Sequence, residues 1–251
     1  YMLFKRKNPI GLDIGSSYIK IARIDDVRAG YELALFDIMP LQPGIVSEGV
    51  IVDKANLIKS LKELLNKTGI KKEDAVICVS GHSSIVIKTI SLPLMTEEEL
   101  AASIKYEAEQ YMPFDINEVY LDFEILGPRQ GSDQMDVVIA AVKRDVMNDY
   151  VDSVKAAGLS VIIVDTDSFA LSNACEVNYD ISELNNIALI NIGASITNIN
   201  ILQNGIPTFT RHIAIGSSVH TERLESSLDI SREDAERIKK GHSIEDISPE
   251  R

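Results

Sequence analysis

Two short stretches of the sequence, far apart along the chain, share one pattern. In residues 12–19 and again in residues 190–197, an apolar residue and an Asp or Asn precede Ile-Gly-small-Ser, and a second strand-like segment follows. Each stretch is typical of a β-hairpin whose turn presents backbone N–H groups, which can hold an anion. The spacing fits neither a Walker loop nor a dinucleotide-binding glycine motif, because both require a helix directly after the glycines. We therefore expect two similar halves whose turns face each other across a cleft and hold one polyphosphate; two unrelated ordinary turns are the alternative.

The composition limits the kind of partner that the chain can bind. It has 251 residues, of which 45% are hydrophobic and 25% charged, and a formal net charge of −13. So acidic a surface argues against nucleic acid or an anionic membrane as the main partner. The two cysteines and four histidines are scattered without the spacing of a metal site or a disulfide framework. Because no apolar run is long enough to span a membrane, we expect a cytoplasmic protein without direct membrane insertion.

The periodicity of the apolar residues predicts an α/β fold with a smaller unit inserted into its first half. Strands and one helix alternate up to about residue 84, and Asp53 and Gly69 are placed to begin and end that helix. The order then becomes β-α-β-β-α, with a capping box at Thr96 and Glu99 and Gly158 after the last helix. The predicted units are a first core subdomain of residues 8–84 and 159–186, an inserted α+β subdomain of residues 85–158, and a second core subdomain of residues 187–251.

The paired turns resemble the two phosphate-binding motifs of the actin-like ATPase superfamily, whose fold is a duplicated ribonuclease H-like core. The resemblance implies ATP and Mg²⁺ as cofactors, with Asp13 and Asn191 holding the metal through water. It also implies that Asp167 orients the attacking water and that Glu236 and Lys239 contact the adenosine. The implied phosphate-binding residues are Asp13, Gly15, Ser16, Ser17, Lys20, Gly193, Ala194, Ser195, Thr197 and Gly216.

Three of these assignments have simpler alternatives. Asp167 can cap the helix that begins near Ser168. Glu236 and Lys239, three residues apart on a predicted helix, can form a surface ion pair. Lys20 can be a solvated lysine on a strand.

Residues in and after the inserted unit narrow the resemblance to one family. Residues 106–122 and 164–171 closely resemble the PilM family of type IV pilus assembly proteins, which has its SHS2-type insert at the same place as the division protein FtsA. The resemblance implies a cytoplasmic ATP-binding scaffold that is recruited to the inner membrane through its partner. That partner is the N-terminal cytoplasmic peptide of PilN, held in a groove between the first core subdomain and the inserted one; other inner-membrane pilus assembly proteins join through this contact. The alternatives are an FtsA-like filament-forming division protein recruited to the membrane, and a small-substrate kinase or phosphatase of the same superfamily.

Two features depart from the family's pattern. Asn191 stands where most relatives carry aspartate, and the change removes a negative charge next to the metal. We therefore expect nucleotide binding with slow or no hydrolysis. The glycine-rich adenine loop that the family places in the second half does not occur in these 251 residues, so we expect the C-terminal part of that half to be missing from this chain.

Overall fold

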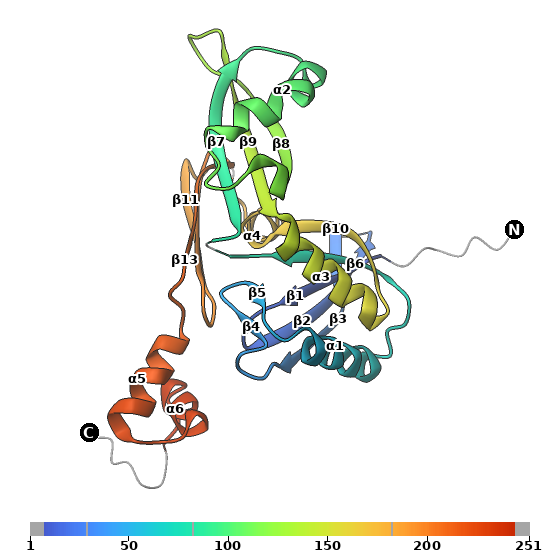
Figure 1. The fold of residues 1–251 in the computed structure, drawn as a ribbon, viewed down its shortest axis with the longest axis vertical. Helices are drawn as coiled ribbons and strands as arrows, with labels where there is room; N and C mark the ends of the chain where they lie inside the picture. Colours follow the sequence, from blue (N-terminus) through green and yellow to red (C-terminus); the bar gives the residue numbers. More distant parts are fainter. Residues whose placement is uncertain (1–7, 29, 82, 182, 244–251) are drawn as a thin grey trace, which may run out of the picture.

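The fold is described by a computed structural model covering residues 8–28, 30–81, 83–181 and 183–243. Residues 244–251 of the predicted second subdomain lie outside this part of the chain. Figure 1 shows a mixed sheet with two helices packed against it, a small sheet-and-helix unit above it, and a second sheet beside that unit. Across the described residues, no helix combines the length and the apolar character needed to cross a membrane.

The first sheet contains five strands in the order β10-β6-β1-β2-β3. Strands β1, β2 and β3 form an antiparallel meander, whereas β6 runs parallel to β1 and β10 parallel to β6. Every second residue of β1 is buried, which is the period of a strand with one face on the core. The strand bounds are Ile10–Ile14 (β1), Tyr18–Val27 (β2), Gly30–Pro40 (β3), Asp74–Val79 (β6) and Ser160–Thr166 (β10).

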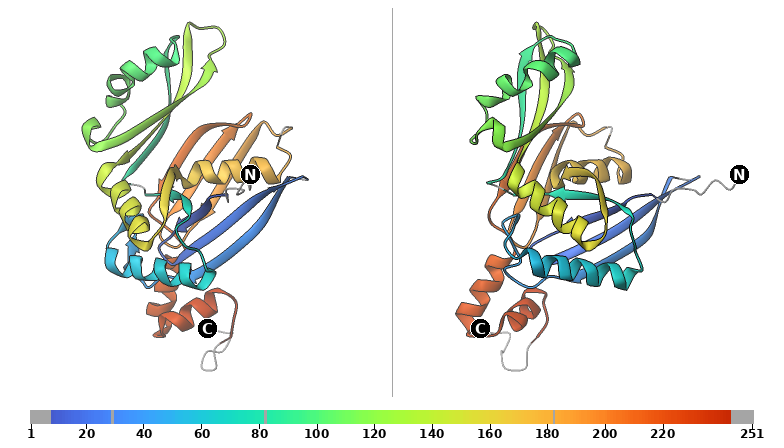
Figure 2. Two further views of the ribbon diagram at one scale, coloured as in Figure 1. Left: turned by 90° about the vertical axis from the view of Figure 1, so that its right-hand side faces the viewer. Right: turned by 45° about the vertical axis from the view of Figure 1, so that its right-hand side comes forward.

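Two helices pack against each other and against the core of this sheet, α1 (Lys54–Thr68) and α3 (Arg144–Ala157) (Figure 2). As predicted, the carboxylate of Asp53 accepts a hydrogen bond from the backbone N–H of Asn56, and Gly69 ends α1 in the left-handed conformation. The subdomain boundaries expected from the sequence put α3 in the inserted unit, but the buried side chains of α3 belong to the core of the first sheet. The apolar stripe of a helix shows that one face is buried and does not show which sheet covers it.

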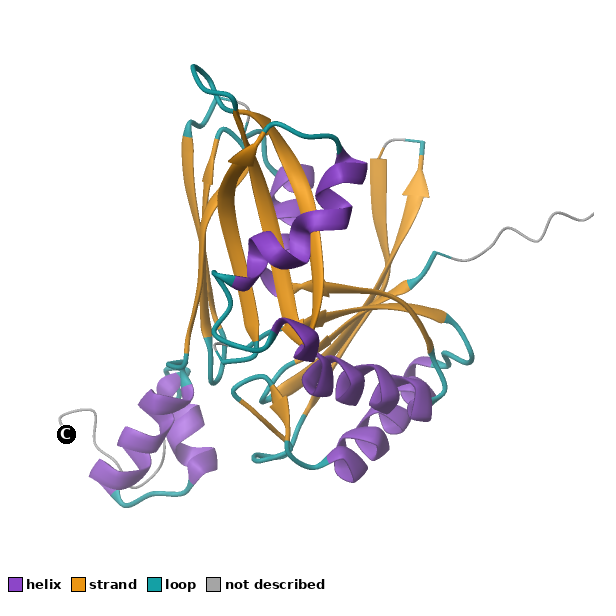
Figure 3. Cartoon of the chain, turned by 45° about the horizontal axis from the view of Figure 1, so that its top comes forward, coloured by secondary structure: helices purple, strands orange, loops and turns teal. Residues whose placement is uncertain are grey.

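The inserted unit is a three-stranded sheet in the order β7-β9-β8 with one helix across a face (Figure 3). The predicted capping box is present, since Thr96 and Glu99 each bond the other's backbone N–H at the start of α2. Apolar side chains of α2 and the sheet form a core of their own, separate from that of the first sheet. The element bounds are Ile85–Pro93 (β7), Glu97–Glu109 (α2), Ile116–Glu118 (η1), Val119–Pro128 (β8) and Gln134–Lys143 (β9).

The second half repeats the opening meander. Strands β11, β12 and β13 pair antiparallel in chain order, as β1, β2 and β3 do. Helix α4 lies between the two halves, because it contacts β6 and β10 of the first sheet and β12 of the second. Helices α5 and α6 pack on each other beyond the end of β13. The bounds are Asp167–Asn178 (α4), Asn186–Ile192 (β11), Thr197–Gln203 (β12), Ile206–Ile213 (β13), Ser218–Leu228 (α5) and Arg232–Lys239 (α6).

A small hairpin that the sequence analysis did not predict precedes α1. Strands β4 (Val46–Ser47) and β5 (Val50–Ile51) are joined by a turn that contains Gly49. Gly49 has a φ of 80°, and a Cβ atom at this position would lie 1.9 Å from the carbonyl oxygen of Ser80. The hairpin therefore packs directly on the end of β6, and only glycine fits at this contact.

We predict that Gly49→Ala strongly destabilises the fold. Gly44→Ala is the matched control, because Gly44 has a similar φ of 85° with open space where its Cβ would be. The control should cost about 1–2 kcal/mol for the left-handed backbone alone. Gly49→Ala should cost about 2 kcal/mol more, because the backbone of Ser80 must also move. Urea unfolding measures both, and equal losses would contradict the proposed close contact.

Candidate functional site

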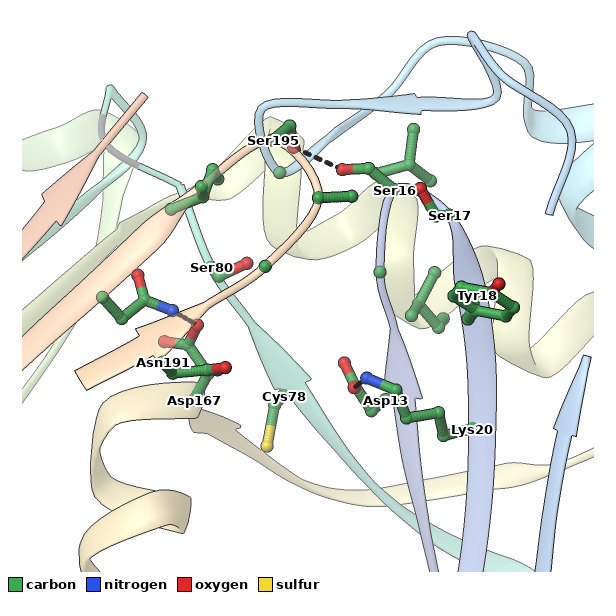
Figure 4. A pocket seen from close by; sticks show the side chains of 18 of the residues that line it. Asp13, Ser16, Ser17, Tyr18, Lys20, Cys78, Ser80, Asp167, Asn191 and Ser195 are labelled. Carbon is green, nitrogen blue, oxygen red and sulfur yellow. Dashed lines mark hydrogen bonds and ion pairs between the residues drawn. The ribbon is translucent and has the colours of Figure 1, made fainter. Parts of the chain in front are cut away.

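The two glycine turns meet in space. The hydroxyl of Ser16 in the first turn lies 2.5 Å from that of Ser195 in the second, and the two are hydrogen-bonded (Figure 4). Both turns are closed by the same backbone bond, from Gly15 N–H to the Tyr18 carbonyl at 3.0 Å and from Gly193 N–H to the Ile196 carbonyl at 2.9 Å. The repeated pattern therefore encodes one local geometry twice, and folding brings the copies face to face.

Close backbone packing explains the glycines of these turns. A Cβ atom would lie 3.1 Å from the Tyr18 oxygen if placed on Gly15, and 2.8 Å from the Ile196 oxygen if placed on Gly193. Gly216 is still more restricted, because its Cβ would lie 2.3 Å from the carbonyl oxygen of Ala194. Backbone N–H groups at the start of α5 then donate to carbonyls of the second turn, from Ser217 to Gly193 and from Ser218 to Ala194, at 2.9 Å each. The second turn is thus fixed from behind by the chain that follows β13.

A cavity of about 370 Å³ opens beside the paired turns. Thr197 and Gly216 support the second turn from behind and do not line it; the hydroxyl of Thr197 donates to the carbonyl of Ile215. The predicted residues that do line the cavity are Asp13, Gly15, Ser16, Ser17, Lys20, Asp167, Asn191, Gly193, Ala194 and Ser195. The structure therefore brings together most of the residues that the resemblance implied.

A single acidic side chain stands at each end of the cavity. Asp13, near the end of β1, forms a 2.7 Å ion pair with Lys20, directly opposite it on β2. In the second copy, Asn191 and Asn198 occupy the equivalent paired positions. In the part of the chain that the structure describes, no group of three His, Cys, Asp or Glu side chains could hold a metal by itself. A magnesium ion here would depend on phosphate oxygens and water for most of its ligands, which is common for Mg²⁺.

Asp167 connects the two halves at the other end of the cavity. It is the first residue of α4, and the N-cap is Thr166, whose hydroxyl accepts from the N–H of Phe169. Asp167 is therefore not the helix cap. Its carboxylate accepts a hydrogen bond from the side-chain amide of Asn198, and its other oxygen lies 3.3 Å from Nε2 of His212. The ring of His212 is buried, so this contact excludes most water.

Cys78 lies at the floor of the cavity, and the sequence analysis did not assign it to the site. Burial, together with the smaller effect of the negative charges of Asp165, Asp13 and Asp167, raises the pKa of its thiol to about 12. The thiol is consequently protonated at neutral pH and chemically quiet. Two further residues near the site, Ser80 and His212, were also missed, because nothing in their local sequence marks them. Asn198 was missed as well, although its place opposite Asn191 in the repeat could have signalled it.

Glu236 and Lys239 lie on α6 and do not line the cavity. Lys239 donates to the carboxylate of Glu236 and to the hydroxyl of Thr221 on α5, and that hydroxyl also bonds Glu236. Burial raises the pKa of Glu236, but the hydrogen bonds from Lys239 and Thr221 outweigh it and the pKa is lowered overall. In this structure the pair holds α5 and α6 together, as the ion-pair alternative expected, and the role toward adenosine stays a prediction.

The duplicated meander, the paired turns and the inserted unit define the actin-like ATPase fold. A family model described as type IV pilus assembly protein PilM matches residues 11–247, so the chain belongs to the PilM family.

Individual relatives agree with this assignment. A solved PilM-PilN type IV pilus biogenesis complex contains a chain that is 27% identical, with a TM-score of 0.83 over 94% of this chain and 70% of that one. The cell division protein FtsA of Bacillus subtilis (strain 168) is 23% identical over 96% of this chain, which spans only 60% of the FtsA length. The ethanolamine utilization protein EutJ from Carboxydothermus hydrogenoformans is 18% identical and shares the fold, with a TM-score of 0.56 over 95% of this chain and 65% of that one.

We predict that Cys78 reacts slowly with iodoacetamide although it borders the cavity. At about pH 8 its alkylation should be at least about tenfold slower than that of free cysteine, because only the thiolate reacts. The raised pKa means that the rate should keep increasing above pH 9, where free cysteine is already mostly thiolate and its rate levels off. Mass spectrometry of the intact protein follows the reaction, and a Cys78→Ser variant isolates the signal of Cys175. A rate equal to that of free cysteine would contradict the buried acidic environment.

Proposed function

We propose that the chain is an ATP-binding scaffold of type IV pilus assembly that holds the N-terminal cytoplasmic peptide of PilN. Membership of the PilM family and the likeness to a PilM-PilN complex support this assignment. The observation that carries it is a long groove between the inserted unit and the first half. Through the peptide, the protein would be recruited to the inner membrane and to other pilus assembly proteins there, without inserting into the membrane itself.

The groove consists of two adjoining cavities of about 470 Å³ and about 360 Å³. One wall is the face of β8 and β9 that carries Asp122 and Ala140, and the other is formed by β10 and α4, with Phe169 bordering both cavities. Strands β8 and β10 are each the last strand of their sheet, so each offers unpaired backbone groups next to the groove. An extended peptide can pair with such an edge and place alternate side chains into the cavities.

The lining of the groove favours a peptide with apolar and cationic side chains. Apolar surface comes from Leu126, Val138 and Phe169, and four carboxylates stand around it. Burial and the charge of Asp167 raise the pKa of one of them, Asp165. A cationic side chain would offset the cost of the partly buried Asp165, and the three exposed carboxylates would attract it to the groove. The carboxylates are Asp122, Glu124, Asp165 and Glu176.

The cavity between the turns fits a magnesium nucleotide. Gly15 and Gly193 line it, so the backbone of the turns would be open to phosphate oxygens; Lys20 would supply a positive charge, and Asp13 would hold the metal through water. When bound, Mg²⁺ would neutralise phosphate charge. Asn191 gives the metal no second carboxylate, and Asp167 is already bonded to Asn198, so both features support binding with slow or no hydrolysis.

Substituting Asp13 tests the nucleotide site. We expect Asp13→Ala to weaken Mg-ATP binding at least tenfold, about 1.4 kcal/mol, and to remove most of the difference between affinities measured with Mg²⁺ and with EDTA. Calorimetric titration measures both affinities. Asp26→Ala, which removes an exposed carboxylate at the far end of β2, should change neither. Unchanged metal-dependent binding in Asp13→Ala would show that the nucleotide lies elsewhere.

Substituting Phe169 tests the peptide groove. Truncation of a central apolar contact typically costs 2 kcal/mol or more, so Phe169→Ala should weaken binding of the PilN N-terminal peptide roughly thirtyfold. Val177→Ala is the control, because Val177 is exposed on the same helix and does not border the groove. Fluorescence anisotropy with a labelled peptide measures the affinities, and circular dichroism verifies the fold. If wild-type protein fails to bind the peptide, the proposed function is wrong.

A further inference from the structure

We propose that Asn198 and His212 are positioning residues, which hold the carboxylate of Asp167 against the second sheet and keep it from serving as a base for water. This inference deepens the proposed function and rests on it, because it concerns how the same cavity treats a bound nucleotide. It assigns the slow hydrolysis to two named side chains, and it makes that property reversible by substitution.

A row of three side chains crosses the second sheet next to the cavity. Asn191 on β11 lies opposite Asn198 on β12, and Asn198 lies opposite His212 on β13. Side chains of directly opposed residues share one face of an antiparallel sheet, so all three project to the same side. This row consists of two amides and an imidazole, without a carboxylate.

The corresponding row of the first sheet is charged. There Asp13 on β1 lies opposite Lys20 on β2, and the two side chains form a 2.7 Å ion pair. About half of each side chain is exposed, 52% for Asp13 and 45% for Lys20. The acid of the first row therefore keeps access to water and to a ligand, whereas the second row has no acid of its own.

Asp167 supplies the acid that the second row lacks. One of its carboxylate oxygens accepts a hydrogen bond from the side-chain amide of Asn198, and the other lies 3.3 Å from Nε2 of His212. Only 18% of the Asp167 side chain and 5% of the His212 side chain are exposed. The hydroxyl of Ser168 lies 3.3 Å from the same ring nitrogen and fixes the ring further. These two contacts form a clamp on Asp167, because the carboxylate cannot turn without breaking at least one of them.

The clamp bears directly on the hydrolysis of ATP. In that reaction the water oxygen forms a bond to the γ-phosphorus, the bond from this phosphorus to the bridging oxygen of ADP breaks, and a proton of the water passes to a base. A general base must lie within hydrogen-bonding reach of the proton that it takes. The resemblance assigned this water to Asp167, but the carboxylate oxygens of Asp167 are directed to Asn198 and His212. Asp167 therefore acts as an acceptor in the joint between the halves.

The amide of Asn198 also has an unused acceptor. Its Oδ1 is buried and receives no hydrogen bond from any residue that the structure describes, and Asn198 lines the cavity. A buried acceptor without a donor is costly, so a water ordered by a bound nucleotide would satisfy it. Asn198 would then bond Asp167 and that water at once, and nucleotide binding would leave the clamp in place.

Releasing Asp167 tests the proposal. We expect Asn198→Ala to increase phosphate release from saturating Mg-ATP at least about tenfold, because a positioned base contributes this much or more. Asp167→Ala in the Asn198→Ala background should cancel the increase. The affinity for Mg-AMPPNP should fall by no more than about tenfold, since one hydrogen bond is lost. A colorimetric phosphate assay measures turnover, and calorimetric titration measures affinity. Asn198→Val, which suits a strand and cannot donate to Asp167, should give the same increase.

Asn200→Ala is the matched control. Asn200 lies on the same strand and bonds Ser172 and Thr210, but it does not contact the clamp. Its substitution should loosen the joint between the halves and leave the rate of phosphate release unchanged. An equal increase in Asn198→Ala and Asn200→Ala would show that a loosened joint is the cause, and would overturn the clamp.

The melting temperature of the ligand-free protein gives a readout that does not depend on turnover. Asn198→Ala and Asp167→Ala should each lower it by about 2–4 °C. The double variant should lose no more than the larger single loss, because either substitution removes the same bond. Additive losses would contradict the clamp.

The outcomes separate this inference from the proposed function. If wild-type protein binds Mg-AMPPNP and both Asn198 variants release phosphate at the wild-type rate, the inference is wrong while the proposed function stands. If wild-type protein does not bind Mg-AMPPNP, both are overturned.

Discussion

The approach of the two glycine turns is the constraint on which the rest of the structure depends. Each turn is closed by one backbone bond, and the turns meet through a single hydrogen bond between Ser16 and Ser195. Such a bond contributes on the order of 1 kcal/mol to stability, so it sets the geometry of the cavity and cannot by itself hold the halves together. The cavity can therefore close on a ligand without a large cost in fold stability.

Helix α4 joins the two core sheets, and this joint is polar. Asp167 is bonded to Asn198 and lies beside His212, while Ser172 pairs with Asn200. Unlike an apolar contact, each of these bonds has a defined partner and direction. The joint thus positions the second half against the first, and it places the same helix against both the cavity beside the paired turns and the groove beside the inserted unit.

Local signals in the sequence predicted the hairpins and helix ends, whose structure depends on contacts between residues close together in the chain. The two hairpins, the capping box of α2 and the glycine that ends α1 were all confirmed, because each is stabilised by contacts within a few residues. The partner of α3 was not predictable from its stripe of apolar residues, and the hairpin at Gly49 had no repeated pattern to mark it. Cys78, His212 and the groove depend on elements far apart in the chain.

The sequence by itself determined the duplication, the fold class and most of the residues that line the cavity beside the paired turns, because a repeated motif carries its own local geometry. Only the tertiary structure decided which cavity each remaining side chain faces. Asp165 and Asp167 are two residues apart, yet one borders the groove and the other the nucleotide cavity. The reason is physical: the chain changes from strand to helix between them, and each cavity has walls that come from separate parts of the chain.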